Sequence, residues 1–108
     1  MKYSIATQFS RVPSARNEGE GKFSGISLRK IIYPLLKECI SNQEKFIIDL
    51  DGTAGYGTSF LEEVFGGLIR EEKLDYSAVC NTLEIISDEE PELKEECWEY
   101  IKDAYEKS

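Results

Sequence analysis

The chain has 108 residues, 41% hydrophobic and 31% charged, values typical of one soluble globular domain spanning residues 1–108. None of its apolar runs reaches the length of a membrane span, and the N-terminus lacks the apolar segment of a signal peptide, so we expect a cytoplasmic protein without membrane contact. The net charge is −8, with +3 on residues 1–50 and −11 on residues 51–108, which argues against nucleic-acid binding.

The chain contains three cysteines and no histidine. An odd number of cysteines without C-x-x-C spacing argues against both a disulfide framework and a zinc site. Without histidine, the chain cannot form the Ser–His and Cys–His pairs of many hydrolases. We therefore expect neither a metal nor a cofactor, and we expect Cys39 and Cys97 to be buried on apolar helix faces.

The first part of the chain is predicted to contain a strand, a loop and a long helix. Residues 3–9 alternate as in a strand, and residues 10–25 are rich in glycine and polar residues, as in a loop that encloses a short second strand. A helix begins after Ser24 or Ser27 and ends near residues 41–42, with a kink at Pro34. Its apolar stripe consists of Leu28, Ile31, Ile32, Leu35, Leu36, Cys39 and Ile40.

The middle of the chain is predicted to be a buried strand over residues 46–50, a glycine loop over residues 51–57 and a second helix. The second helix begins at Thr58 or Ser59, where Ser59-Phe60-Leu61-Glu62 matches a capping box. Two adjacent glycines inside this helix, Gly66 and Gly67, indicate that another backbone approaches it closely.

The last part of the chain is predicted to contain a strand and a third helix. Residues 74–80 contain a turn and strand residues, and residues 83–86 form the final strand. The third helix starts at Pro91 and buries a face made of Leu93, Cys97, Tyr100, Ile101 and Ala104, with Trp98 at the edge of the core. Strands that alternate with helices predict an α/β fold with crossover connections.

The segment over residues 46–70 carries the candidate functional residues, and its first interpretation is enzymatic. Residues 46–53, FIIDLDGT, match the hhhDxDGT signature of haloacid-dehalogenase-type phosphatases. That resemblance implies Mg²⁺-dependent phosphoryl hydrolysis, with Asp49 as nucleophile and Asp51 as general acid/base. A second interpretation is a nucleotide-binding loop, because Gly52, Gly55 and Gly57 precede a helix N-terminus, although the loop contains no lysine.

The third interpretation rests on a longer match. The run Gly55-Tyr56-Gly57-Thr58-Ser59-Phe60-Leu61-Glu62-Glu63-Val64-Phe65-Gly66-Gly67-Leu68-Ile69-Arg70, preceded by Asp49-Leu50-Asp51-Gly52 and by Ser24-Gly25 with Arg29, resembles the bacterial STAS-like family of uncharacterised function. The resemblance covers most of residues 3–106. It implies a single STAS-like domain with a mixed sheet of four or five strands and about three helices largely on one face.

The resemblance also implies a non-enzymatic, regulatory role. STAS domains of anti-sigma-factor antagonists are phosphorylated at the start of the helix that follows this loop, and they bind histidine-kinase-like ATPases. By position, Thr58 and Ser59 are the candidate phosphorylation sites, although Gly57 and Phe60 replace the residues that flank the phosphosite in those proteins. The implied docking surface consists of Gly55, Tyr56, Gly57, Thr58, Ser59, Glu62 and Glu63.

The same residues also have a purely structural interpretation. Asp49 and Asp51 would then accept hydrogen bonds within the loop, and Thr58 or Ser59 would cap the helix. Glu62 and Glu63 would interact with the helix dipole in its first turn. Tyr56 has two open interpretations, as a plug in the core or as an exposed contact residue.

Overall fold

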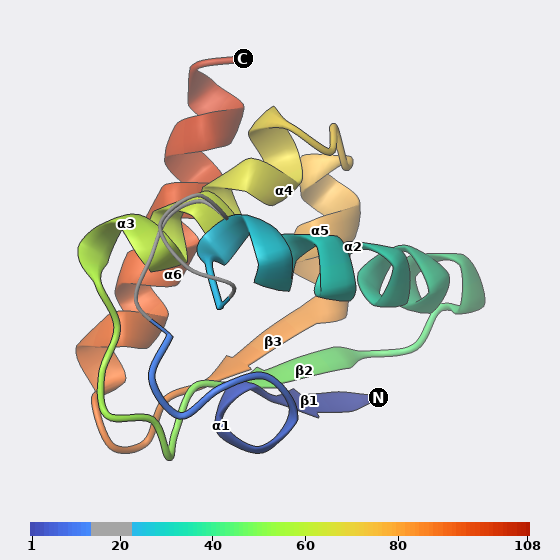
Figure 1. The fold of residues 1–108 in the computed structure, drawn as a ribbon. Coiled ribbons are helices and arrows are strands. Elements are labelled where there is room, and N and C mark those ends of the chain that lie inside the picture. The colour runs from blue at the N-terminus through green and yellow to red at the C-terminus, as the bar shows by residue number, and fades with distance from the viewer. Residues whose placement is uncertain (14–22) are drawn as a thin grey trace.

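The computed structural model describes residues 1–13 and 23–108, and Figure 1 shows a small sheet with helices packed over one side of it. Within the described residues the sheet has three parallel strands in the order β1-β2-β3, so β2 is central. The elements, in chain order, are β1 (Lys2–Ser4), α1 (Ile5–Gln8), α2 (Gly25–Asn42), β2 (Phe46–Asp49), α3 (Thr58–Leu61), the π-helix η2 (Glu62–Gly66), α4 (Gly67–Arg70), α5 (Tyr76–Thr82), β3 (Leu83–Ile86) and α6 (Pro91–Glu106).

The α/β class is confirmed, but the predicted sheet of four or five mixed strands is wrong for the described residues, which contain three strands, all parallel. The short strand predicted within residues 10–25 falls largely on residues 14–22, outside the described part. The strand expected within residues 74–80 is replaced by α5, which begins because the Asp75 side chain accepts a hydrogen bond from Ala78 N–H at 3.0 Å. There are also more helical segments than the three predicted.

The first strand is shorter than predicted. Only Lys2–Ser4 is extended, and α1 follows at once because the Ser4 side chain accepts a hydrogen bond from Thr7 N–H at 3.4 Å and caps the helix. The strand predicted from the alternation over residues 3–9 is therefore wrong beyond Ser4, because the Ser4 cap starts a helix at Ile5.

The helix α2 is continuous through Pro34, and Ser24 caps it by accepting a hydrogen bond from Ser27 N–H at 3.1 Å. The predicted stripe is buried at Leu28, Ile32 and Leu36, but Ile31 is 42% exposed. The helix ends one residue before Gln43, which adopts the left-handed conformation with φ 57°.

The core lies between the sheet and the helices (Figure 1). Phe46 and Ile48 of β2 are fully buried on the helix side, whereas Ile47 and Asp49 lie on the other, partly exposed side. Cys39 and Cys97 are buried, as predicted, and Cys80 is exposed. This packing places the loop after β2 at the carboxyl end of the sheet, beside the start of α3.

Candidate functional site

The carboxyl end of β2 carries the two aspartates of the candidate phosphatase motif, and both accept hydrogen bonds within the fold. Asp49 Oδ1 accepts one from Asp51 N–H at 2.9 Å, and Asp49 Oδ2 lies 3.7 Å from Lys2 Nζ. The Asp51 carboxylate accepts hydrogen bonds from the N–H groups of Asp88 and Glu89 at 3.1 and 3.0 Å. Asp51 thereby fastens the loop after β2 to the segment between β3 and α6.

Further hydrogen bonds hold the same loop. Gly52 N–H donates to Glu89 Oε1 at 2.9 Å, and Ala54 N–H donates to the carbonyl of Arg11 at 2.7 Å. Gly52 has φ 91°, a backbone conformation that is strained for any residue with a Cβ atom, so the turn requires glycine at this position. These bonds connect the loop to the segments that follow β3 and α1, so its backbone is braced on two sides.

Tyr56 is a plug at the edge of the core. Its hydroxyl donates to the carbonyl of Leu50 at 2.8 Å, and its ring centroid lies 5.8 Å from that of Phe60. Burial is the main reason that the pKa of the Tyr56 phenol is raised above its ordinary value. Of the two interpretations left open by the sequence, the structure favours the plug, although the ring is not fully covered.

The start of the second helix differs from the predicted capping box. Gly57 occupies the N-cap position with extended backbone, and no side chain caps α3. Thr58 and Ser59 are therefore the first two helical residues, and Ser59 is half-buried. The predicted cap at Ser59 is wrong because glycine, which lacks a capping side chain, is tolerated at the N-cap.

Glu62 and Glu63, which were predicted to interact with the helix dipole, form ion pairs with arginines. Glu63 is 9% exposed, and its Oε2 accepts hydrogen bonds from Arg29 at 2.8 Å and from Arg70 at 3.2 Å. Glu62 Oε2 pairs with Arg70 at 2.7 Å. Arg29 also reaches Glu72 at 3.0 Å, so this charged seam, made of Arg29, Glu62, Glu63, Arg70 and Glu72, joins α2 to the helical stretch after the loop.

The charged seam coincides with the π-helix η2. A π-helical turn frees backbone carbonyls from the ordinary α-helical pattern. Arg29, 7% exposed, donates to the carbonyl of Glu63 at 2.8 Å, which satisfies one such group. Sequence reasoning gave Arg29 no role, although it lies three residues before Ile32 and seven before Leu36, on the buried face of α2.

Gly67 is explained by the same arginine. A Cβ atom at this position would lie 2.3 Å from one Arg29 guanidinium nitrogen and 2.8 Å from its Cδ. The prediction that another backbone approaches the glycine pair is therefore wrong, because the neighbour is a buried arginine side chain. At Gly66 the nearest atom would be Glu62 Oε2, the end of a flexible side chain, at 2.6 Å.

Two hollows lie near these elements. A shallow groove of about 360 Å³ runs along the loop and is lined by Val12, Pro13, Ala54, Gly55, Tyr56 and Gly57. Val12, 61% exposed, and Pro13 were not predicted as members of this surface. The groove thus combines small loop residues with apolar side chains from the segment after α1.

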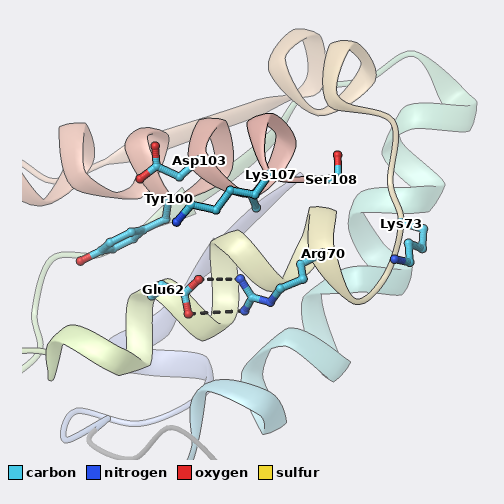
Figure 2. A pocket seen from close by; sticks show the side chains of 8 residues that line it. Glu62, Arg70, Lys73, Tyr100, Asp103, Lys107 and Ser108 are labelled. Atoms are coloured by element: carbon cyan, nitrogen blue, oxygen red, sulfur yellow. Dashed lines mark hydrogen bonds and ion pairs between the residues drawn. The ribbon is translucent and has the colours of Figure 1, made fainter.

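The second hollow, of about 520 Å³, lies between α4 and α6 (Figure 2). Figure 2 shows the Glu62–Arg70 pair on one wall and Tyr100, Asp103 and Lys107 on the opposite helix. Acidic and basic groups are mixed along its lining, and none of the predicted docking residues except Glu62 reaches it. The lining of this hollow therefore does not indicate whether a ligand would be acidic, basic or neutral.

The described part of the chain contains no group of three or more cysteine, aspartate or glutamate side chains arranged to hold a metal ion. Across residues 1–13 and 23–108, no helix combines the length and apolarity that crossing a membrane requires. Of the predicted docking residues, Gly55, Tyr56 and Gly57 line the shallow groove, while Glu63 points into the charged seam.

Comparison with known proteins gives one match. A family described as STAS-like domain of unknown function (DUF4325) matches residues 24–92, which include the loop, the π-helix and the last strand. Neither the curated proteins nor the solved structures contain a match.

Proposed function

Because this chain belongs to the family of STAS-like domains of unknown function, we propose that it is a non-enzymatic regulatory module that binds a partner protein through the segment 55–63. The observation that carries the proposal is the loop over residues 51–57, in which three of seven residues are glycine and the backbone is held by hydrogen bonds to the rest of the fold. Gly52, Ala54 and Gly57 are exposed, while the hydrogen bonds of Asp51 and Tyr56 fix the backbone between them.

A rigid surface of small residues favours protein binding for two reasons. A partner backbone can approach it closely, and little conformational entropy is lost when the surface is already ordered. The groove beside it adds the apolar side chain of Val12, which is exposed. The partner class implied by resemblance to anti-sigma-factor antagonists is a histidine-kinase-like ATPase, and we propose a cytoplasmic complex of this kind.

We propose further that phosphorylation of Thr58 or Ser59 switches this binding. Both residues lie in the first helical turn, where free backbone N–H groups stabilise negative charge. Glu62 and Glu63 follow within one turn, but both are paired with arginines, which reduces their repulsion of a phosphate. A doubly negative group beside Gly57 would disfavour an acidic or apolar partner surface.

The test is site-specific photo-crosslinking in the native host. A photo-reactive amino acid replaces Ala54, an exposed residue directly before the segment 55–63 that lines the same groove as Gly55 and Gly57. In a control it replaces Ser77, which is exposed on α5. The proposal predicts a crosslink from position 54, and not from position 77, to a protein with a histidine-kinase-like ATPase domain. Crosslinks from position 77 alone, or from neither position, contradict it.

Two further measurements separate the switch and the enzymatic alternative. Peptide mapping by mass spectrometry is expected to find phosphate on Thr58 or Ser59 in a fraction of the native protein, and its absence in every growth condition contradicts the switch. Incubation with Mg²⁺ and an aryl phosphate is expected to give no turnover. Turnover that the Asp49→Asn substitution abolishes would contradict the proposal of a non-enzymatic module.

A further inference from the structure

The helical stretch over residues 58–70 contains the π-helix η2, although its sequence has the spacing of an uninterrupted α-helix. Its buried apolar side chains lie along one face at α-helical intervals, at Leu61, Val64, Phe65, Leu68 and Ile69. An α-helical pattern also pairs each interior carbonyl with the N–H four residues later, whereas a π-turn pairs groups five residues apart and leaves one carbonyl over. The local sequence therefore does not account for the π-turn, and a contact from outside the stretch is needed to explain it.

Arg29 of α2 makes such a contact. One of its guanidinium nitrogens donates to the Glu63 carbonyl oxygen and to Glu63 Oε2, both at 2.8 Å, so it holds the backbone and the side chain of one residue in the turn. Its Nε donates to Glu72 Oε2 at 3.0 Å, just beyond the end of the stretch. Arg29 therefore binds residues on both sides of Gly67, where the missing Cβ atom leaves space for the guanidinium.

The turn before η2 is joined to the segment 55–63. Phe60 N–H donates to the Gly57 carbonyl at 3.1 Å, and the fully buried Phe60 ring packs on Tyr56 with ring centroids 5.8 Å apart. If η2 closed into an α-helical turn, the residues before it would rotate relative to α4 by about 100°, the angle that one residue spans in an α-helix. That rotation would carry the Phe60 ring away from Tyr56 and change which side chains the segment presents.

We propose that Arg29 is a positioning residue for the segment 55–63. By binding the Glu63 carbonyl beside Gly67, it holds the stretch in the π-register, in which the N–H groups of the turn bond to carbonyls five residues earlier. Without Arg29 in this place, the stretch takes the α-register that its apolar spacing allows. The consequence for partner binding rests on the proposed function, whereas the register itself does not.

The register is measured by NMR on the full chain, through scalar couplings across hydrogen bonds, which show whether an amide bonds to the carbonyl four or five residues earlier. Two adjacent glycines give a matched pair of variants. A Cβ atom at Gly67 would overlap an Arg29 guanidinium nitrogen, so Gly67→Ala displaces the arginine and is expected to remove the π-pattern. Gly66→Ala meets the ends of two flexible side chains and is expected to keep it.

A second pair of variants separates the backbone hydrogen bond from the charge. Glu63→Gln keeps the carbonyl that Arg29 binds and is expected to keep the π-pattern. The double variant Arg29→Met, Glu63→Leu removes both members of the buried ion pair, so neither charge stays buried without the other, and it is expected to take the α-register. Circular dichroism checks folding, and the glycine pair stands as the test if the double variant does not fold.

A merely structural role of Arg29 would lower stability without changing the register. The proposal is overturned if the π-pattern persists in Gly67→Ala, or if Gly66→Ala loses it to the same extent. Nuclear Overhauser contacts between the Phe60 and Tyr56 rings are expected to disappear together with the π-pattern, and their persistence would contradict the positioning role.

Partner binding gives a separate result. The partner found by crosslinking at position 54 is expected to bind Gly67→Ala about tenfold more weakly than Gly66→Ala. Equal affinities in the two variants, with the register changed in only one, would show that the register does not position the docking surface. Absence of any crosslinked partner would contradict the proposed function alone, because the register and the ring contacts are measured in the isolated protein.

Discussion

Two acidic regions lie next to each other in the chain but are stabilised by different means. In the loop after β2, Asp49 and Asp51 accept hydrogen bonds from backbone N–H groups at the surface. In the charged seam, Glu63 is nearly buried and meets the guanidinium groups of Arg29 and Arg70. Asp49 and Asp51 resemble a catalytic pair in sequence, but in the structure both carboxylates accept hydrogen bonds from backbone N–H groups and hold the loop in place.

The difference lies in how much each region loses when one partner is removed. Water can replace a backbone hydrogen bond at the surface, so the loop should tolerate the loss of a carboxylate. A carboxylate left unpaired in the seam cannot be solvated to the same extent. The two regions therefore predict a graded series of effects on the free energy of unfolding.

The largest effect is expected for Arg29→Ala. It removes a donor to the Glu63 carboxylate, a donor to the Glu63 carbonyl and the partner of Glu72. Urea denaturation should show a loss of about 3 kcal/mol or more, as for a broken buried ion pair. Arg70→Ala is the control, since its side chain is 39% exposed and its pairs are screened by solvent, and it should cost about 1 kcal/mol or less. Equal losses for the two variants would contradict the account of the seam.

The next largest effect is a difference in stability between alanine substitutions at two adjacent glycines. Gly67→Ala places Cβ against the buried Arg29 side chain, so the arginine must move, at a cost of about 2 kcal/mol. Gly66→Ala meets the ends of the flexible Glu62 and Arg70 side chains, and the gain in helix propensity, about 1 kcal/mol, should offset the strain. Thermal denaturation of both variants measures the contrast, and a Gly67→Ala variant as stable as the Gly66→Ala variant would contradict it.

A smaller effect is expected for Asp51→Ala. The substitution releases the N–H groups of Asp88 and Glu89, which water can then bind, so the loss should be about 1 to 2 kcal/mol. Hydrogen exchange should accelerate at these two amides while the amides of Ile47 and Leu50, which donate hydrogen bonds within the sheet, stay protected. Unchanged exchange at residues 88 and 89 would show that Asp51 does not fasten the loop.

The smallest effect is expected for Tyr56→Phe, which removes the hydrogen bond to the Leu50 carbonyl at a cost of about 1 kcal/mol. The raised pKa of Tyr56 also predicts a pH dependence. As the pH rises past about 10, the phenol ionises in the unfolded chain before it does in the folded protein, so stability falls. Denaturation across this range should show a steeper fall for the wild type than for Tyr56→Phe, and equal slopes would contradict the burial of the ring.

Most of the helices and strands that build the core could be predicted from the sequence. The helical spacing along α2 and α6, the central strand β2 and the strand at residues 83–86 are confirmed, because these elements carry strong periodicity or continuous apolar residues. Burial of β2 on both sides is wrong, since Ile47 and Asp49 are partly exposed. The helix α5 was missed because its seven residues are too short to show a period, and an Asp75 cap starts it. The charged seam was missed because pairing between Arg29 and Glu63, 34 residues apart, depends on tertiary packing.

The candidate site divides in the same way. The position of the glycine loop before a helix was predictable from local residues, whereas the groove with Val12 and Pro13 depends on a contact between distant segments. The roles of Asp49 and Asp51 could not be separated from a catalytic motif by sequence, because the hydrogen bonds to residues 88 and 89 join segments that only the fold brings together.

The most direct test of the docking surface is the affinity of the partner identified by crosslinking, measured by calorimetry for two matched variants. Ala54→Arg puts a large charged side chain on the braced loop, and Ser77→Arg puts the same side chain on α5. If the partner docks on the loop, Ala54→Arg should weaken binding by about a hundredfold while Ser77→Arg binds as the wild type does. Wild-type affinity in the Ala54→Arg variant would show that the loop is not the docking surface.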